Sequence, residues 1–338
     1  MRAYVLAPDF GLDRLSIVEQ PTREPGPREV RVAIRACSLN YRDWLMVEGR
    51  YNPKQPLPLV PLSDGVGVVT AVGGDVRRFA SGDRVAGNFC QGWLAGEPTR
   101  EKLRATLGGP LDGMLRQEVV LPEDGWVHVP AHLSDEEAAC LPCAGLTAWS
   151  ALFTQGGVKA GDTVLVLGTG GVAVFALQLA RLAGARVIVT SRSDEKLERA
   201  RALGAHATVC TAREAQWGNA VRELTGGIGV DHVIEVGGVG TLEQSLRATR
   251  VGGHVSLIGV LAGSSSALNL TPVLMQNIRV QGVLVGSREG FEAMNRAITT
   301  SSLRPVVDRV FAFEQTREAF AALATGSHFG KLVIRVAG

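Results

Sequence analysis

The spacing of apolar residues changes near Pro130. Before that point apolar residues form short runs, as in Val30–Ile34, where valine and isoleucine alternate with charged residues. Such alternation is typical of half-buried β-strands. Two more short apolar runs bounded by glycine, Gly65–Val72 and Asp83–Ala86, predict further strands. The segment 88–113 is polar, rich in glycine and without a clear period, so it is predicted to be a loop or small lobe.

Beyond Pro130 predicted strands alternate with predicted helices. Ser134 and Glu137 have the S-x-x-E spacing of a capping box and predict the start of a helix. The strands that follow are almost continuously apolar, which predicts a parallel sheet covered by helices on both faces. The predicted strands are 163–167, 186–190, 207–210, 231–235, 253–258, 280–285, 306–310 and 331–336. The predicted helices between them are 172–183, 194–203, 212–224 and 241–249, and two more are expected after residue 288.

The turn Gly168–Ala173 joins a predicted strand to a predicted helix and has the form G-x-G-x-x-A. Its first glycine permits a tight turn, its second lets the backbone approach a pyrophosphate, and its alanine lets the helix pack close to the strand. The helix N-terminus presents free N–H groups and a partial positive charge to a phosphate. The sequence therefore predicts a dinucleotide site. The residues assigned to the phosphates are Gly168, Gly170, Gly171 and Val172.

The end of the next strand distinguishes NAD from NADP. An NAD site has Asp or Glu about 20 residues after the first glycine, where it binds the ribose hydroxyls. Here Ser191 takes that place, with Arg192 beside it and Lys196 one turn along. A hydroxyl and two cations attract the 2′-phosphate, so the sequence predicts NADP(H). The alternative is that Arg192 and Lys196 only begin a solvated helix.

Composition and charge narrow the class of function. The chain has 338 residues, of which 46% are apolar and 20% charged, enough for two domains. With 35 basic and 33 acidic residues the net charge is +2, which gives no electrostatic support for binding nucleic acid or an anionic membrane. The uncharged run 163–180 contains the glycine turn and fits a strand and helix better than a membrane span. Scattered cysteines and no visible signal peptide predict a cytoplasmic protein. The predicted dinucleotide site implies a small-molecule substrate.

The chain also resembles the medium-chain dehydrogenase/reductase superfamily, which includes zinc alcohol dehydrogenases and quinone oxidoreductases. The motifs that carry this resemblance are 61–69, 82–85, 143–148, 168–173 and 330–334. The resemblance implies an α/β fold in which a GroES-like β-barrel catalytic domain, 1–128 and 287–338, is interrupted by a Rossmann dinucleotide-binding domain, 129–286, with a doubly wound parallel sheet. It also implies an active site in the cleft between the domains. The resemblance further implies a homodimer or homotetramer, in which pairing of the strand 279–285 across a two-fold axis would hide an open sheet edge.

The same resemblance leads us to expect no metal. Zinc members hold the catalytic metal with a Cys, a His-Glu pair and a second Cys, and these positions fall here on Asn40, Ser63, Asp64 and Cys143. Asparagine and serine are poor zinc ligands, so only two suitable groups remain. The four-cysteine lobe of structural zinc is also missing, since the segment 88–113 contains only Cys90.

Three residues are predicted to be catalytic. The amide of Asn40 can donate to the substrate oxygen, and the phenol of Tyr51 or Tyr41 can supply a proton. Tyr51 resembles the proton-donating tyrosine of mitochondrial-type enoyl reductases, although a packing role for either tyrosine stays open. The residues that the resemblance assigns to the nicotinamide side of the cofactor site are Thr147, Val236, Gly237, Gly259, Val260, Val285, Gly286, Ser287 and Lys331.

The leading functional hypothesis is an NADP(H)-dependent, zinc-independent oxidoreductase that transfers hydride to a quinone, an activated alkene or a carbonyl. One alternative is a zinc-free alcohol dehydrogenase or ketone reductase, and another is a non-catalytic NADPH-binding protein. A redox role for the C-x-x-C pair Cys140 and Cys143 would need a helix that opens at the first cysteine. Because the helix is predicted to begin earlier, Cys143 is expected to line the cleft instead.

Overall fold

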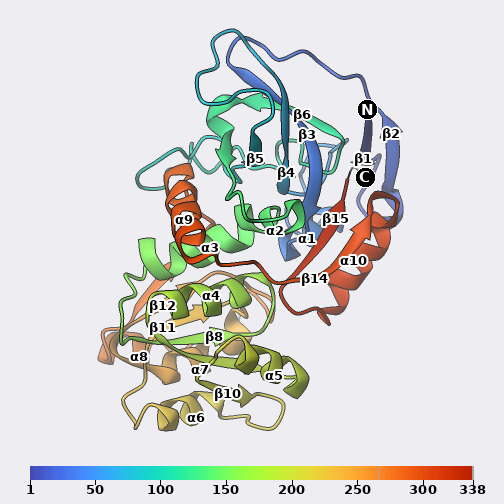
Figure 1. Ribbon diagram of the computed structural model, residues 1–338. Coiled ribbons are helices and arrows are strands. Elements are labelled where there is room, and N and C mark those ends of the chain that lie inside the picture. The colour runs from blue at the N-terminus through green and yellow to red at the C-terminus, as the bar shows by residue number, and fades with distance from the viewer. Residues whose placement is uncertain (266, 337–338) are drawn as a thin grey trace. The chain divides into compact units, whose positions relative to one another are not determined.

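The computed structural model describes residues 1–265 and 267–336, which form two compact units (Figure 1). Unit 1 comprises Met1–Leu146 and Gly286–Gly338, and unit 2 comprises Thr147–Val285. The predicted domain limits place residues 129–146 with the dinucleotide-binding domain, whereas the contacts within the chain place them with unit 1.

Unit 2 contains a six-stranded, fully parallel sheet in the order β10-β9-β8-β11-β12-β13. Its strands are β8 (Thr163–Leu167), β9 (Arg186–Ser191), β10 (Ala207–Cys210), β11 (Val230–Glu235), β12 (Thr249–Leu257) and β13 (Arg279–Gly282). In chain order this is the 3-2-1-4-5-6 arrangement of a doubly wound sheet, in which the direction of winding reverses between β8 and β11. Ligands of such sheets bind beyond the carboxyl ends of the strands at that reversal.

Helices cover both faces of this sheet, as the apolar strands require. They are α4 (Gly171–Leu182), α5 (Asp194–Ala202), α6 (Trp217–Leu224), α7 (Val239–Ala248) and α8 (Thr271–Met275). The short helix α3 (Leu146–Trp149) precedes β8 in the chain. Trp217 and Val221 of α6 and Leu242 and Leu246 of α7 share one apolar core with the strands. Helices α4 and α5 pack against β8, β9 and β10. Because crossovers between parallel strands are right-handed and the winding reverses at β8, these two helices cover the other face.

Unit 1 is built mainly from antiparallel strands. Its larger sheet has the order β14-β15-β3-β4-β5-β7, with β6 also paired to β3, and β1 pairs with β2. The strands are β1 (Arg2–Leu6), β2 (Leu15–Glu19), β3 (Glu29–Ser38), β4 (Asp64–Val72), β5 (Arg84–Gly87), β6 (Glu118–Pro122), β7 (Trp126–His128), β14 (Val307–Ala312) and β15 (Lys331–Arg335). The helices are α1 (Tyr41–Val47), α2 (Asp135–Ala138), α9 (Arg288–Ser301) and α10 (Thr316–Thr325). The predicted capping box is present, because Ser134 accepts from the N–H of Glu137 and Glu137 accepts from that of Ser134.

Local backbone conformation explains why one predicted helix begins later and one predicted strand ends earlier than expected. The helix predicted from residue 212 begins at Trp217, because the N–H groups of Arg213 and Glu214 first form turns onto the carbonyl of Cys210. The strand predicted to reach Val285 ends at Gly282, and Val285 itself has a left-handed backbone with φ of 51°. A left-handed β-branched residue cannot continue a strand.

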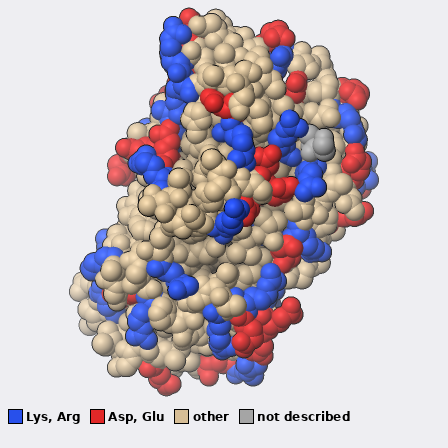
Figure 2. Space-filling view, viewed as in Figure 1, with Lys and Arg blue, Asp and Glu red and all other residues tan. Residues whose placement is uncertain are grey.

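The surface fits the near-neutral composition. Basic and acidic side chains are interspersed over the face drawn in Figure 2, and neither sign covers it continuously. Within residues 1–265 and 267–336, no helix is both long and apolar enough to cross a bilayer.

Candidate active site

The glycine turn after β8 leaves room for a ligand. Gly168 has φ of +77°, a conformation that glycine adopts at low cost. A Cβ atom built on Gly168 or Gly170 would meet no protein atom within 4 Å. Gly170 is the N-cap of α4, and no side chain caps that helix. The first N–H groups of α4 therefore lie beside open space, which is an arrangement that binds phosphate.

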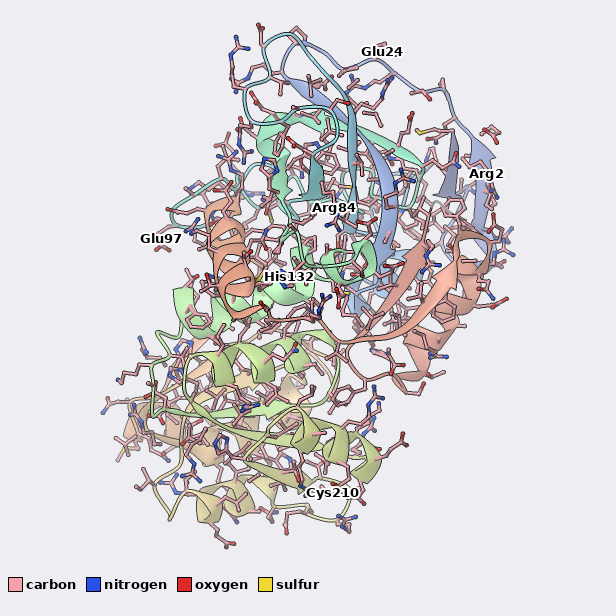
Figure 3. All side chains as sticks on the ribbon, viewed as in Figure 1. Arg2, Glu24, Arg84, Glu97, His132 and Cys210 are labelled. Atoms are coloured by element: carbon pink, nitrogen blue, oxygen red, sulfur yellow. The ribbon has the colours of Figure 1, made fainter. Side chains whose placement is uncertain are left out.

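At the end of β9 the side chains favour an anion. Ser191 accepts a hydrogen bond from the N–H of Ser193, 3.2 Å away. The neighbouring Asp194 pairs with Arg213, so its charge is already compensated. Within the described chain, the exposed guanidinium of Arg192 makes no hydrogen bond or ion pair. The carbonyl of Arg192 accepts from the thiol of Cys210, which Figure 3 labels at the end of β10.

Three more predicted cofactor segments follow strand ends at the same edge of the sheet. Val236 and Gly237 come after β11, Gly259 and Val260 after β12, and Val285 after β13. The chain approaches itself so closely that a Cβ on Gly259 would lie 2.5 Å from the carbonyl oxygen of Val236.

The remaining predicted cofactor residues have other surroundings. Thr147 is buried on α3, Ser287 caps α9 by accepting from the N–H of Gly290, and Gly286 begins the second segment of unit 1. Lys196 is partly buried in the first turn of α5.

Glu235 fixes the turn after β11, a role that the sequence patterns did not predict. Its carboxylate is fully buried and accepts from the N–H of Gly237 at 2.7 Å and of Gly238 at 3.1 Å. The hydroxyls of Thr241 and Ser245 also donate to it. A fully hydrogen-bonded buried carboxylate holds its neighbours rigidly. The sequence does contain a local indication of this role, because an acidic residue ends the predicted strand shortly before Gly237 and Gly238.

In unit 1 the four positions that the resemblance assigns to zinc ligands form one hydrogen-bonded chain. Asn40 Nδ2 donates to Ser63 Oγ at 3.4 Å, and Ser63 Oγ donates to Asp64 Oδ1 at 2.7 Å. The other oxygen of Asp64 accepts from the N–H of Cys143 at 3.2 Å. Lys331 donates to Asn40 Oδ1 at 2.6 Å, so a cationic side chain joins this chain at Asn40.

This set of donors does not fit a zinc ion. Zinc in such sites is bound by thiolate, imidazole or carboxylate, and here an amide and a hydroxyl stand at two of the positions. The amide oxygen already faces an ammonium, and both oxygens of Asp64 accept hydrogen bonds.

The C-x-x-C pair is also poorly suited to redox chemistry. Burial raises the pKa of Cys140 to about 12 and raises that of Cys143 as well, so neither thiolate is favoured. Both residues are free cysteines. Cys143 lies in a π-helical segment, Leu141–Gly145, a form of helix that is frequent at functional sites.

Arg42 serves a structural purpose, because its guanidinium binds the lobe 88–113. It donates to the carbonyls of Leu107 and Gly109 at 2.9 and 3.1 Å and pairs with buried Asp43. Burial raises the pKa of Asp43, and the adjacent Arg42 acts in the opposite direction. The guanidinium also lies 4.9 Å from the ring centre of Tyr51.

The two candidate tyrosines differ in exposure. Tyr51 is 45% exposed beneath Arg42, whereas Tyr41 is partly buried and its ring lies 5.4 Å from that of Trp44. Neither hydroxyl hydrogen-bonds another residue of the described chain. Both phenols can therefore donate to a ligand.

Two family models match this chain. The alcohol dehydrogenase GroES-like domain matches residues 26–131, and the zinc-binding dehydrogenase domain matches residues 171–300. A zinc-type alcohol dehydrogenase-like protein of Schizosaccharomyces pombe is 44% identical over 333 residues, covering 96% of each chain. A solved structure of an NAD-dependent alcohol dehydrogenase is 37% identical with a TM-score of 0.91, covering 100% of each chain. A quinone oxidoreductase of Pseudomonas syringae pv. Tomato DC3000 is 29% identical with a TM-score of 0.83 and 99% coverage of each chain.

The chain belongs to the medium-chain dehydrogenase/reductase superfamily. The predicted α/β fold, with a parallel sheet and a GroES-like N-terminal domain, is confirmed. The protein is an oxidoreductase of the alcohol dehydrogenase and quinone oxidoreductase type, and its family implies a nicotinamide cofactor.

The two glycines of the turn should respond differently to an added methyl group. Gly168→Ala should lower the stability of the protein by about 1 kcal/mol, because alanine is strained at positive φ. Gly170→Ala should leave the melting temperature unchanged and weaken dinucleotide binding about ten-fold or more, because the methyl group would fill the open space beside α4. Thermal melts and fluorescence titration with NADPH and NADH measure both effects.

Gly74→Ala is the matched control, since its Cβ also meets no protein atom and Gly74 lies in unit 1. It should change neither quantity. Unchanged dinucleotide affinity in Gly170→Ala would show that the phosphates bind elsewhere.

Proposed function

We propose that this protein is an NADPH-dependent, zinc-independent reductase of quinones, activated alkenes or carbonyl compounds. The observation that carries the proposal is the Asn40 amide, whose oxygen accepts a hydrogen bond from the ammonium of Lys331. By the resemblance, Asn40 stands at a position that holds a metal ligand in zinc members. Such an amide is a neutral hydrogen-bond donor for a substrate oxygen and needs no metal.

The bound nicotinamide supplies the hydride. Hydride transfer to a carbonyl, a quinone or a conjugated alkene places negative charge on the substrate oxygen, so that oxygen needs donors. Asn40 Nδ2 has two hydrogens, of which one makes a long contact of 3.4 Å with Ser63. The second is assigned to the substrate oxygen, and the phenol of Tyr51 or Tyr41 is assigned the role of proton donor.

The preference for NADPH is supported by the residues at the end of β9. The guanidinium of Arg192 is exposed and has no ion-pair partner in the described chain, and Ser191 replaces the acid that would repel a 2′-phosphate. The phosphates are assigned to the turn after β8. The nicotinamide is assigned to residues at the strand ends and beside them, namely Thr147, Val236, Gly237, Gly259, Val260, Val285, Gly286 and Ser287.

A second candidate function is a zinc-free alcohol dehydrogenase or ketone reductase. The relatives named alcohol dehydrogenases favour this candidate, and one of them is described as NAD-dependent. The same amide could stabilise an alkoxide, so the two candidates differ in substrate rather than in site.

We also propose that two copies of the chain associate through β13. All four residues of this edge strand are exposed, which leaves backbone groups able to pair with another strand. Large apolar side chains are exposed nearby, with Leu270 64%, Leu274 76% and Met275 71% exposed. An open edge beside an apolar surface is suited to a two-fold contact between identical chains.

The cofactor and substrate assignments can be tested together. NADPH oxidation with a panel of quinones, enones and simple ketones should exceed NADH oxidation, with a kcat/KM ratio of about ten or more for the best substrate. Arg192→Ala should raise the KM for NADPH about ten-fold and leave the KM for NADH unchanged, because only NADPH carries the 2′-phosphate.

Arg186→Ala is the control, since this exposed arginine begins the same strand at its opposite end. Equal use of both cofactors would refute the NADPH assignment. Turnover of ketones alone would favour the second candidate, and tight NADPH binding without turnover would indicate a binding protein.

Charge placed on the proposed contact should separate the two copies. Leu274→Arg and Met275→Arg should shift the protein toward monomer in sedimentation velocity, because each would bury a cation against an apolar surface. Ile228→Arg, at another apolar residue that is 66% exposed, should leave the assembly intact. A monomeric wild-type protein would contradict this proposal.

A further inference from the structure

Lys331 is a buried cation whose position the fold determines. Its residue is 3% exposed, and its ammonium donates to the carbonyl of Leu39 and to Asn40 Oδ1. Strand β15 runs antiparallel to β3 with Val333 opposite Ser38, so Lys331, two residues earlier, lies beside Leu39 and Asn40. A buried charge is costly unless it is paired and hydrogen-bonded, so these contacts constrain the ammonium strongly.

Gly330 brings the chain into this position. It has φ of +84°, and a Cβ on it would lie 2.4 Å from the carbonyl oxygen of Val306. The N–H of Lys331 then donates to that same carbonyl at 3.0 Å. The Gly-Lys pair is therefore needed both for the close approach and for the cation.

The ammonium decides which way the Asn40 amide points. An ammonium has donors only, so it can face only the amide oxygen, and the amide nitrogen must then lie on the other side. On that side Nδ2 meets Ser63 Oγ at 3.4 Å, while the Ser63 hydroxyl is itself directed at buried Asp64. Lysine on one side and the Ser63–Asp64 pair on the other hold the amide from both ends.

We propose that Lys331 is a positioning residue of the active site, which holds Asn40 Oδ1 so that the amide hydrogen not directed at Ser63 points to the substrate oxygen. This inference rests on the proposed function of Asn40 and assigns Lys331 to the substrate side of the reaction rather than to the cofactor. Two observations support this role. The ammonium contacts Asn40 directly, and Asn40 Nδ2 meets the Ser63 hydroxyl, which is hydrogen-bonded to Asp64.

A double-mutant cycle tests this coupling. Lys331→Met and Asn40→Ala should each lower kcat for the best panel substrate about 100-fold, with NADPH affinity within about two-fold of wild type. If Lys331 acts through Asn40, the double variant should be no slower than Asn40→Ala. Additive losses would overturn the proposal. A Lys331→Met variant with weaker NADPH binding and unchanged kcat would also overturn it, because Lys331 would then bind the cofactor rather than position Asn40.

Two further variants separate positioning from folding. Lys331→Arg keeps a cation and hydrogen-bond donors, so it should retain more activity than Lys331→Met at a similar melting temperature. Lys159→Met removes an exposed lysine of unit 2 and should change nothing. If Lys331→Arg is as slow as Lys331→Met although both are folded, the proposal fails.

Neutron crystal structures of the wild type and Lys331→Met distinguish the amide nitrogen from its oxygen and provide a readout that does not depend on turnover. The Asn40 side chain should keep one orientation in the wild type and lose or reverse it in the variant. An unchanged Asn40 orientation in the variant would overturn the positioning role. If the Asn40 amide reverses in the variant and the wild type turns over no substrate, the positioning role is supported and the proposed reductase function is refuted.

Discussion

The contact between the Lys331 ammonium and the Asn40 amide oxygen is the interaction on which the candidate active site depends. It joins the last strand of unit 1 to the segment after β3, two parts of the chain separated by 291 residues. Because an ammonium cannot accept a hydrogen bond, it can face only the oxygen of the Asn40 amide, and the amide nitrogen must point away from it. Two buried carboxylates lie close by: Asp43 accepts from the N–H of Asn40 and pairs with Arg42, and Asp64 accepts from Ser63. In the proposed mechanism, this amide is a fixed donor that needs no metal ion.

The candidate dinucleotide site follows from the parallel sheet of unit 2. All six strands point the same way, so each carboxyl end reaches one edge, and the loops there share a single region. Gly168 and Gly170 leave space beside the N-terminus of α4, and Glu235 holds the turn after β11 with four hydrogen bonds. The fold determines at which edge of the sheet the dinucleotide site lies. Two glycines without side chains and one buried carboxylate then determine its local shape.

Sequence patterns were sufficient where a local rule governs the outcome. The strand Thr163–Leu167 and the capping box at Ser134 could be predicted, because apolar runs and the S-x-x-E spacing are local signals. The contacts of Lys331 and Arg42 could not, since they depend on the register of β15 against β3 and on the path of the lobe 88–113. Helix α1 was missed as well, because seven residues with mixed polarity give no clear period.

The most direct test of the central claim is metal analysis combined with activity. Protein purified without chelator should contain well under one zinc ion per chain, and its NADPH-dependent turnover should be unchanged after chelator treatment and after zinc is added back. A stoichiometric zinc ion whose removal abolishes turnover and whose return restores it would contradict the account, because the Asn40–Lys331 contact could not then occupy the position of the metal ligands.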